Sequence, residues 1–300
     1  MVRKALKWTG IALGGLVALL VLVLVGLYAS TGLRLSKTYR IDPAPLRVLS
    51  DAATMERGRH WTAVHCTGCH GEDLSGTVVF EDPSLGRVEA NNLTSGRGGI
   101  ASTYGDADWL RAIRHGVRPN GKPLVIMPSK EYYHLSDEDL AAIIAYVKSV
   151  PSVDSAMGGY TFKPMARILT AVGAFGDILA AEVIDHSAPR PAAPLVGASV
   201  EYGAYLARTG GCLGCHGQEL SGGKDPNPAA PPAPNITLGG SPGRWSEAEF
   251  VAVMRTGVAP GGRQGSEFMP WKYMGRMSDG ELKALWQYLK SLPAKASTAP

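Results

Sequence analysis

A long apolar run near the start of the chain is its strongest hydropathy feature. Residues 8–28 read WTGIALGGLVALLVLVLVGLY and carry no charge. As a helix this run would reach about 32 Å, which matches a hydrocarbon core of about 30 Å. Trp8 and Tyr28 stand at its ends, where interfacial aromatic residues are expected. We therefore predict a membrane-spanning helix within an anchor over residues 1–40. The alternative is a cleaved signal peptide, whose apolar stretch is shorter, about 7–15 residues.

Elsewhere the apolar positions follow a helical period. The spacing i, i+3, i+4, i+7 occurs twice, in Leu140, Ile143, Ile144 and Val147 and again in Leu282, Leu285, Trp286 and Leu289. Ser278 and Glu281 have the spacing of a capping box at the start of the second of these helices. Alternation typical of a strand is confined to short pieces such as Thr77–Phe80. Because the chain also holds 37 Gly and 21 Pro, we predict an all-α fold with much irregular chain.

The two halves of the chain are copies of one unit. Three pairs of segments show this: Glu56-Arg57-Gly58 with Glu201-Tyr202-Gly203, Asn92-Leu93-Thr94 with Asn235-Ile236-Thr237, and Ser136 to Leu140 with Ser278 to Leu282. We therefore predict a first domain over residues 41–151 and a second over residues 198–293. Residues 152–197 would link them, and residues 294–300 would form a tail.

The predicted linker contains two distinct segments. Ile168–Ile184 is apolar but includes Asp177 and Glu182, so a helix packed between the two domains is favoured over a second membrane span. A membrane-surface or partner contact is the alternative. Pro189–Pro194 is rich in proline and has the composition of a stiff tether.

Charge is distributed unevenly along the chain. The whole sequence has 30 Lys and Arg against 26 Asp and Glu, a net charge of +4. Residues 1–40 contain six of the basic side chains and no acidic one, which leaves 24 basic and 26 acidic side chains in residues 41–300. The basic excess therefore flanks the predicted anchor, and a nucleic-acid partner is not expected.

All four cysteines fall in two copies of one pentapeptide. Cys66-Thr67-Gly68-Cys69-His70 and Cys212-Leu213-Gly214-Cys215-His216 both have the C-x-x-C-H spacing of covalent haem c attachment. The two thiols bond to the porphyrin vinyl groups, and His70 and His216 would each be a proximal iron ligand. A four-Cys zinc site would place its pairs about 15–20 residues apart, and a redox pair would not need a histidine twice. The sequence therefore predicts two covalently attached haem c groups.

A six-coordinate haem needs a second axial ligand. Met127 and Met269 each precede a proline and follow the haem motif at a similar interval, so we predict them as the sixth ligands. The alternative for both is core gap-filling. Rival ligands are His115 and His134 in the first half, and Met254, Met274 and Met277 in the second.

Other residues carry smaller expectations. Trp109 and Phe250 could pack on haem but are more typical of core positions, and Asn92 and Asn235 are expected to organise turns. Arg114 and Arg255 are expected to be exposed near helix C-termini, with neutralisation of a haem propionate as the alternative. His65 is expected to be an exposed neighbour of the first motif rather than a ligand.

These motifs together resemble a duplicated class I c-type cytochrome, and more narrowly the cytochrome c subunits of membrane-bound alcohol and sugar dehydrogenases. The resemblance covers residues 54–151 and 198–293. It implies two tandem cytochrome c domains after the transmembrane helix. This chain departs from those subunits in having two haem motifs rather than three, and an anchor at the N-terminus rather than the C-terminus.

The same resemblance implies attachment of haem outside the cytoplasmic membrane of a bacterium. The anchor would then be a single pass, with both haem domains in the periplasm. The expected function is a membrane-tethered dihaem cytochrome with two His/Met-ligated irons. The expected partners are a quinol- or substrate-oxidising dehydrogenase as donor and an oxidase or soluble cytochrome as acceptor. The alternatives are a peroxidase-like enzyme with one open iron and an electron-transfer subunit of a multi-subunit dehydrogenase.

Overall fold

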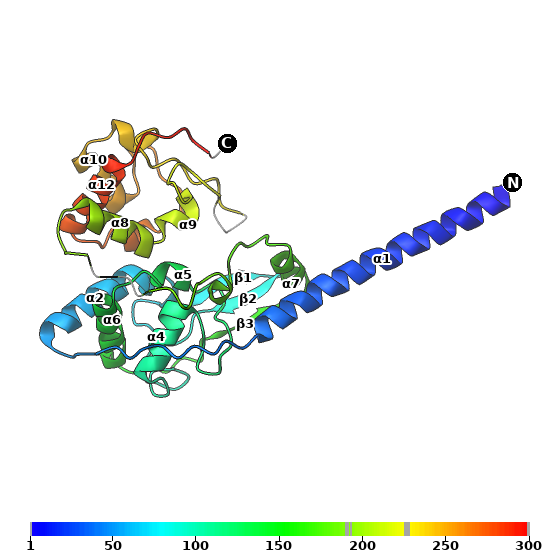
Figure 1. The fold of residues 1–300 in the computed structure, drawn as a ribbon, viewed down its shortest axis with the longest axis horizontal. Helices are drawn as coiled ribbons and strands as arrows, with labels where there is room; N and C mark the ends of the chain where they lie inside the picture. The colour runs from blue at the N-terminus through cyan, green and yellow to red at the C-terminus, as the bar shows by residue number, and fades with distance from the viewer. Residues whose placement is uncertain (1, 190–191, 193, 225–228, 299–300) are drawn as a thin grey trace.

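The N-terminal helix stands apart from the rest of the protein (Figure 1). The computed structural model describes residues 2–189, 192, 194–224 and 229–298. Helix α1 (Val2–Ser36) is continuous over 35 residues. It is exposed along the whole predicted span, and side chains become buried only near its C-terminal end, at Thr31 and Leu35. Of the described helices, α1 alone is long and apolar enough to cross a membrane.

The remaining elements lie in the two repeated units and in the segment between them. The first unit contains α2 (Ala52–His65), α3 (Thr67–His70), β1 (Val78–Asp82), β2 (Gly86–Glu89), α4 (Asp106–His115), α5 (Ser129–Tyr132) and α6 (Asp137–Ser149). The intervening segment contains β3 (Gly159–Phe162), α7 (Pro164–Ala171) and the 3₁₀ helix η1 (Ala180–Glu182). The second unit contains α8 (Val200–Thr209), α9 (Cys212–His216), η2 (Ser241–Arg244), α10 (Glu247–Thr256), α11 (Trp271–Met274) and α12 (Asp279–Ser291). The predicted all-α class is thus confirmed in its main features.

In each unit the first helix crosses the last helix at a glycine. A Cβ atom added to Gly58 in α2 would lie 2.0 Å from the carbonyl oxygen of Ala142 in α6. A Cβ atom added to Gly203 in α8 would lie 2.0 Å from the carbonyl oxygen of Ala284 in α12. Real Cβ atoms do not approach an oxygen so closely. The repeated glycine therefore sets how near the two helices of each unit can come.

A small sheet is the main element that the hydropathy pattern did not predict. Strands β1 and β2 pair antiparallel, and β2 pairs antiparallel with β3, which comes from the segment after α6. The strands are only four or five residues long, and such short pieces give a weak periodic signal. The segment after the first unit therefore returns to it and completes its sheet.

The apolar segment Ile168–Ile184 begins within α7, which packs against α1. This outcome agrees with the expected packing, but the contact is with the N-terminal helix rather than between the two units. Thr31 donates its hydroxyl to the carbonyl oxygen of Arg167, at 2.7 Å. Arg34 forms an ion pair with Glu182 at 2.6 Å. The proposed stiff tether, Pro189–Pro194, lies partly outside the described residues.

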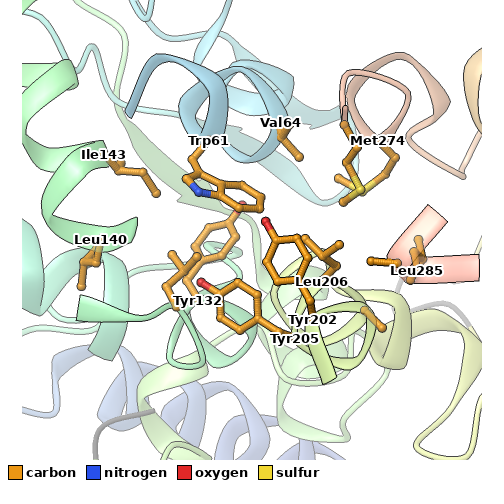
Figure 2. Close-up of a cluster of buried hydrophobic side chains, with 14 of the residues drawn as sticks. Trp61, Val64, Tyr132, Leu140, Ile143, Tyr202, Tyr205, Leu206, Met274 and Leu285 are labelled. Carbon is orange, nitrogen blue, oxygen red and sulfur yellow. The ribbon is translucent and has the colours of Figure 1, made fainter. Parts of the chain in front are cut away.

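The two units share one hydrophobic core (Figure 2). Trp61 and Tyr132 of the first unit lie close to Tyr202 and Tyr205 of the second, and all four are at least nine-tenths buried. Helix α11 packs against α2, and α5 packs against α8. Because α2 corresponds to α8 and α5 to α11 in the repeat, these contacts are reciprocal. The two units are thus related by an approximate twofold arrangement, like the subunits of a symmetric dimer.

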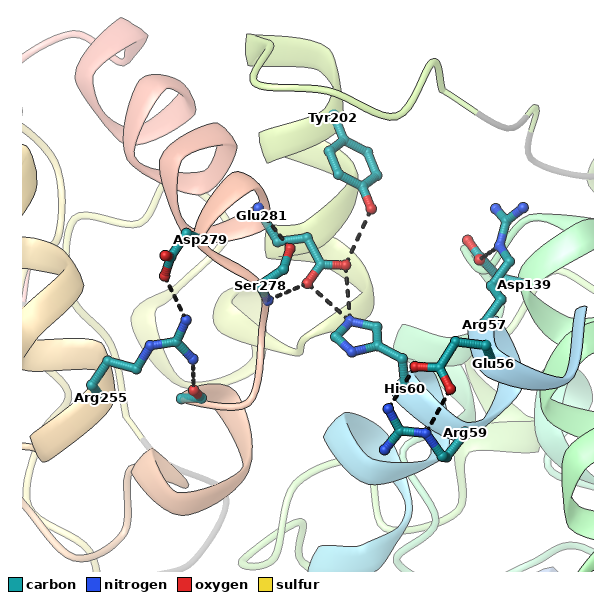
Figure 3. Close-up of polar contacts among 11 residues, drawn as sticks. Glu56, Arg57, Arg59, His60, Asp139, Tyr202, Arg255, Ser278, Asp279 and Glu281 are labelled. Atoms are coloured by element: carbon teal, nitrogen blue, oxygen red, sulfur yellow. Dashed lines mark hydrogen bonds and ion pairs between the residues drawn. The ribbon is translucent and has the colours of Figure 1, made fainter. Parts of the chain in front are cut away.

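Two carboxylates hold this interface in equivalent positions (Figure 3). Asp139, at the N-terminus of α6, accepts a bond from Arg57 of its own unit at 2.6 Å and another from the Tyr205 hydroxyl of the second unit. Glu281, at the N-terminus of α12, accepts bonds from Tyr202 of its own unit at 3.4 Å and from His60 of the first unit at 2.9 Å. We name Asp139 with Arg57 and Tyr205 the Asp139 latch. We name Glu281 with Tyr202 and His60 the Glu281 latch.

Candidate haem sites

Each haem motif forms a single helical turn after the first helix of its unit. In the first unit the amide of Cys66 donates to the Thr62 carbonyl, so the motif continues the direction of α2. Gly71 and Gly217 follow the two motif histidines with φ of 83° and 80°. Side chains other than glycine rarely adopt that conformation, so the glycine after each histidine ends the turn. Both motifs therefore place two cysteines and a histidine along one short turn.

The two motif histidines are oriented in the same way. Nδ1 of His70 lies 2.8 Å from the carbonyl oxygen of Asn91, and Nδ1 of His216 lies 2.7 Å from that of Pro234. A carbonyl oxygen only accepts, so Nδ1 is the protonated nitrogen and Nε2 carries the lone pair. Burial lowers the pKa of His70, although its bond to Asn91 acts in the opposite direction. A neutral, oriented imidazole of this kind suits axial ligation of iron.

A cavity in the first unit brings the predicted site residues together. Its wall includes all four predicted residues of this half, Cys66, Cys69, His70 and Met127. It encloses about 1120 Å³ of empty space, part of which is open to solvent. The rest of the wall is largely apolar and includes Leu93, Ile113, Leu135, Ile143 and Val147. The wall of the cavity therefore combines the first haem motif with the thioether of Met127, in largely apolar surroundings.

The loop that carries Met127 is held at both sides. Ile126 has a left-handed backbone with φ of 66°, and its amide donates to the Ile178 carbonyl at 2.8 Å. Pro128 follows and caps α5. A β-branched residue at positive φ is strained, so contacts around it must hold it there. The segment around η1 thus helps to position the methionine, which the sequence alone did not indicate.

The rival ligands of the first half lie elsewhere. Among the described residues that line the cavity, neither His115 nor His134 is present. His115 is buried, with its Nδ1 3.1 Å from Nδ1 of His186. His134 is half-buried, and burial lowers its pKa, with the charge of Arg208 as a smaller cause. Met127 is therefore the candidate that shares a cavity with His70.

In the second half the motif and Met269 border the shared core. Cys212 and Met269 are partly buried and pack against it. The amide of Trp271 donates to the Met269 carbonyl at 2.8 Å, which matches the bond from Ser129 to Met127 in the first half. The rivals Met254, Met274 and Met277 are buried within the core itself. The equivalent loop geometry supports Met269 as the counterpart of Met127.

Three buried nitrogen atoms on the wall of the first cavity test whether haem fits there. Trp109 Nε1, Arg118 Nε and His65 Nε2 have no hydrogen-bond partner within the described part of the chain. Buried polar atoms are normally satisfied, and the N–H groups of Trp109 and Arg118 can only donate, so their place on the cavity wall indicates a bound group with acceptors. A porphyrin with carboxylate substituents meets this need and fills an apolar space. The residues present therefore fit a haem.

Two expectations about exposure were wrong. His65 is not an exposed neighbour, since it lines the cavity and stacks on Trp61 with ring centroids 5.1 Å apart. Burial lowers the pKa of His65 to about 4. Arg114 is buried, because it bonds Asp137 at 2.8 Å and the Leu135 carbonyl at 2.7 Å. The i, i+4 spacing of residues 61 and 65 was the signal that could have placed His65 on the buried face of its helix.

The expected asparagine turns are present. Asn92 Oδ1 accepts from the Thr94 amide, and Asn235 Oδ1 accepts from the Thr237 amide, both at 2.9 Å. The amide nitrogen of Asn92 also donates to the Val153 carbonyl, at 2.8 Å. Each asparagine thus shapes its turn and ties it to the chain beyond the last helix of its unit.

The surroundings of Cys66 and Cys212 disfavour the thiolate form of these two side chains. Burial raises the pKa of Cys66 to about 12, with the neighbouring Cys69 as a smaller cause, and burial raises that of Cys212 to about 11. Thiolate is the form that binds zinc or attacks a disulfide, and these surroundings disfavour it. No cluster of three or more His, Cys, Asp or Glu side chains that could hold a metal ion occurs among the described residues.

Comparison with known proteins agrees with this geometry. The family model "Cytochrome c" matches residues 55–151 and again residues 200–293. The fructose dehydrogenase cytochrome subunit of Gluconobacter japonicus is 24% identical over 91% of this chain and 58% of its own length. The cytochrome c subunit of the quinone alcohol dehydrogenase of Gluconacetobacter polyoxogenes is 24% identical over 81% of this chain and 57% of its own length.

The chain thus spans a little over half the length of these curated relatives. Reduced cytochrome c4 from Pseudomonas stutzeri, a solved structure, is 19% identical and covers 80% of this chain and 98% of its own. Its TM-score is 0.21, which is too low to bear on the fold. The two family matches together cover more than half of the chain, and each contains one C-x-x-C-H motif. This chain belongs to the cytochrome c family.

Proposed function

We propose that this chain carries two covalent haem c groups, each ligated by histidine and methionine, and transfers electrons between redox proteins. The observation that carries the proposal is the cavity whose wall includes Cys66, Cys69, His70 and Met127 together. The equivalent placement of His216 and Met269 extends it to the second half. Bound haem c would supply a one-electron iron couple, whose potential methionine ligation raises.

The chain's own part in this function is to orient ligands and exclude water. The carbonyls of Asn91 and Pro234 fix the imidazoles of His70 and His216. The apolar wall lowers access of water to the first cavity. Two axial side chains would leave no open position for a substrate, which favours electron transfer over peroxidase chemistry. The latches keep the two units in one arrangement, so the distance between the two sites is fixed by packing.

A membrane location follows from α1 in this proposal. The apolar span is exposed, and the C-terminal part of α1 is bonded to the protein through Thr31 and Arg34. We place the helix in the bacterial cytoplasmic membrane as an uncleaved single pass, with both haem domains in the periplasm. The two curated relatives described above are named as cytochrome subunits of dehydrogenases. A quinol- or substrate-oxidising dehydrogenase is therefore the proposed donor, and an oxidase or soluble cytochrome the acceptor.

The test is the haem content and oxidised absorption spectrum of the purified protein. The proposal expects two haems per chain, the absorption band of thioether-to-iron ligation, and no high-spin signal. Met127→Leu and Met269→Leu should each remove about half of the thioether band. Met277→Leu, a buried methionine of the second half, is the matched control and should leave the band unchanged. A high-spin haem that binds peroxide in the unsubstituted protein would contradict the proposal.

The partners can be tested separately. Redox proteins dock through small, transient interfaces that complementary charges guide. Purification from native membranes, after chemical cross-linking, should recover a dehydrogenase or an oxidase. Recovery of neither, from membranes that contain both, would count against the proposed donor and acceptor while leaving haem ligation intact.

A further inference from the structure

A small surface of the first unit lies beside the point where α1 leaves its apolar span. Thr31 bonds the carbonyl of Arg167 at 2.7 Å, and Arg34 bonds the carbonyl of Thr170 at 3.1 Å. Residue numbers rise together in the two helices, so α7 runs in the same direction as α1. The beginning of α7 therefore points toward the span and its end points away from it.

The level of each residue along α1 follows from this direction. Both helices rise by about 1.5 Å per residue. The residue three positions before Thr31 and the residue three positions before Arg167 therefore lie at the same height. At that height α1 has Tyr28, the last residue of the uncharged run, and α7 has Pro164. The guanidinium of Arg167 lies over the Tyr28 ring, 4.8 Å from its centroid. The start of α7 is thus level with the end of the apolar span.

This end of the first unit exposes apolar and basic groups together. Met165, next to Pro164, is 55% exposed, and Lys163 is also exposed, with its ammonium donating one hydrogen bond to the Pro83 carbonyl. The amide of Lys163 donates to the Leu85 carbonyl at 3.0 Å, which places the turn between β1 and β2 beside it. Pro83 in that turn is exposed. Glu81, at the end of β1, is exposed but forms an ion pair with Arg87 at 3.3 Å.

We infer that Met165, Lys163 and the turn at Pro83 rest in the headgroup layer of the phospholipid bilayer that α1 crosses. This inference rests on the proposed function, in which α1 spans a membrane. A thioether side chain beside a lysine suits the boundary between headgroups and acyl chains, and an ammonium has three donors, so Lys163 can bond a lipid phosphate as well as Pro83. The bonds from Thr31 and Arg34 to carbonyl oxygens of α7 hold α7 to α1, and the Arg34–Glu182 ion pair holds η1 there too, so the protein sits on the membrane at a fixed height.

The experiment places a thiol-reactive fluorophore at single sites of the full-length holoprotein in phosphatidylcholine–phosphatidylglycerol nanodiscs. The substitutions are Met165→Cys and Val172→Cys, and the unsubstituted protein reports background labelling of the motif cysteines. Val172 is the matched control, because it follows the far end of α7 and is 59% exposed. Nitroxide lipids labelled at the headgroup should quench strongly at residue 165 and leave residue 172 unchanged.

A third label separates this inference from the membrane anchor itself. Leu16→Cys lies in the middle of the span, and nitroxides deep in the acyl chains should quench it. Quenching at residue 16 with equal, weak quenching at residues 165 and 172 would overturn the membrane contact and leave the anchor standing. Absence of quenching at residue 16 would overturn the anchor and the contact with it. Arg34→Gln should reduce quenching at residue 165 while leaving residue 16 quenched.

Discussion

The two halves of the protein meet through equivalent positions that carry different chemistry. His60 of the first unit and Tyr205 of the second occupy matching places in α2 and α8, and each reaches the carboxylate of the other unit. Arg57 and Tyr202 likewise match, and each bonds the carboxylate of its own unit. The Asp139 latch thus pairs a buried carboxylate with an arginine and a phenol. The Glu281 latch pairs a buried carboxylate with a histidine and a phenol.

This difference shows how duplication allows an interface to diversify while its geometry stays fixed. The last helix of each unit begins with serine at the N-cap and a carboxylate three residues later. That carboxylate is needed locally at a helix N-terminus. The neighbouring unit then uses the same group as an acceptor. The carboxylate is kept, as Asp139 or Glu281, while the donors on α2 and α8 have changed in kind, so the two latches should respond differently to substitution and to pH.

The largest expected effect tests the glycine at the helix crossing, which is the same in both units. Gly58→Ala and Gly203→Ala should each destabilise the protein by about 3 kcal/mol or more, because the added methyl would overlap a backbone carbonyl that cannot move aside. Thermal unfolding followed by circular dichroism measures this loss. Gly10→Ala in α1, where an added Cβ meets nothing within 4 Å, is the control. A cost at only one of the two crossings would show that the halves are less alike than their backbones suggest.

The second prediction compares the two carboxylates. Asp139→Ala should cost about 3 kcal/mol, because Arg57 and the Tyr205 hydroxyl lose their acceptor in a buried place. Glu281→Ala should cost less, about 2 kcal/mol, since a phenol and an imidazole stand where the Asp139 latch has a permanently charged guanidinium. Chemical denaturation measures both. Equal losses would mean that the charge of Arg57 adds nothing to the Asp139 latch.

The third prediction concerns pH. Burial acts to raise the pKa of Glu281, but the hydrogen bond and charge of His60, with hydrogen bonds from Ser278, outweigh it and hold the pKa below its ordinary value. A lowered carboxyl pKa stabilises the fold above the unfolded value, near 4.5, and that stability is lost as the pH falls through the folded pKa. His60→Phe should therefore reduce stability by about 1 kcal/mol at neutral pH, and this loss should become smaller only as the pH falls below 4.5 and Glu281 is protonated.

Tyr205→Phe is the matched variant in the other latch. It should cost about 1 kcal/mol, with nearly the same loss at neutral pH and at about pH 3, because a phenol donor carries no charge at either pH and can also donate to a protonated carboxyl group. Denaturation across this range compares the two variants directly. Identical pH profiles for His60→Phe and Tyr205→Phe would refute the proposed difference between the latches.

The smallest effect concerns an ion pair whose acidic residue is replaced by an uncharged one at the equivalent position of the other unit. Arg276 and Lys272 of the second unit pair with Glu72 of the first, at 2.6 and 3.0 Å, and lower the pKa of Glu72 to about 2. The matching residue to Glu72 in the second motif is Gln218. Because Glu72 is more than half exposed, Glu72→Gln should cost at most about 0.5 kcal/mol. The loss should vanish in high salt, and a loss that persisted there would identify a buried role for this pair.

Much of the fold and of the sites could be predicted because the relevant signals are local. The haem motifs, the apolar span and the capped last helices each occupy one short stretch of sequence. The first unit's sheet could not be predicted, since β3 comes from beyond α6 and its pairing is set by tertiary contacts. The carbonyls that orient His70 and His216 were also missed, because a backbone acceptor has no residue type to recognise. Placement of Met127 as a ligand stays a prediction.

The glycine crossings also bear on the order in which the protein can be assembled. Helix α2 is made early in the first unit, yet the surface that fits Gly58 is provided by α6, near the end of that unit. The same holds for Gly203 in α8 and for α12, which ends close to the C-terminus. Because synthesis runs from the N-terminus, the first unit can close while the second is still being made. The second unit then completes its fold only as the last residues arrive.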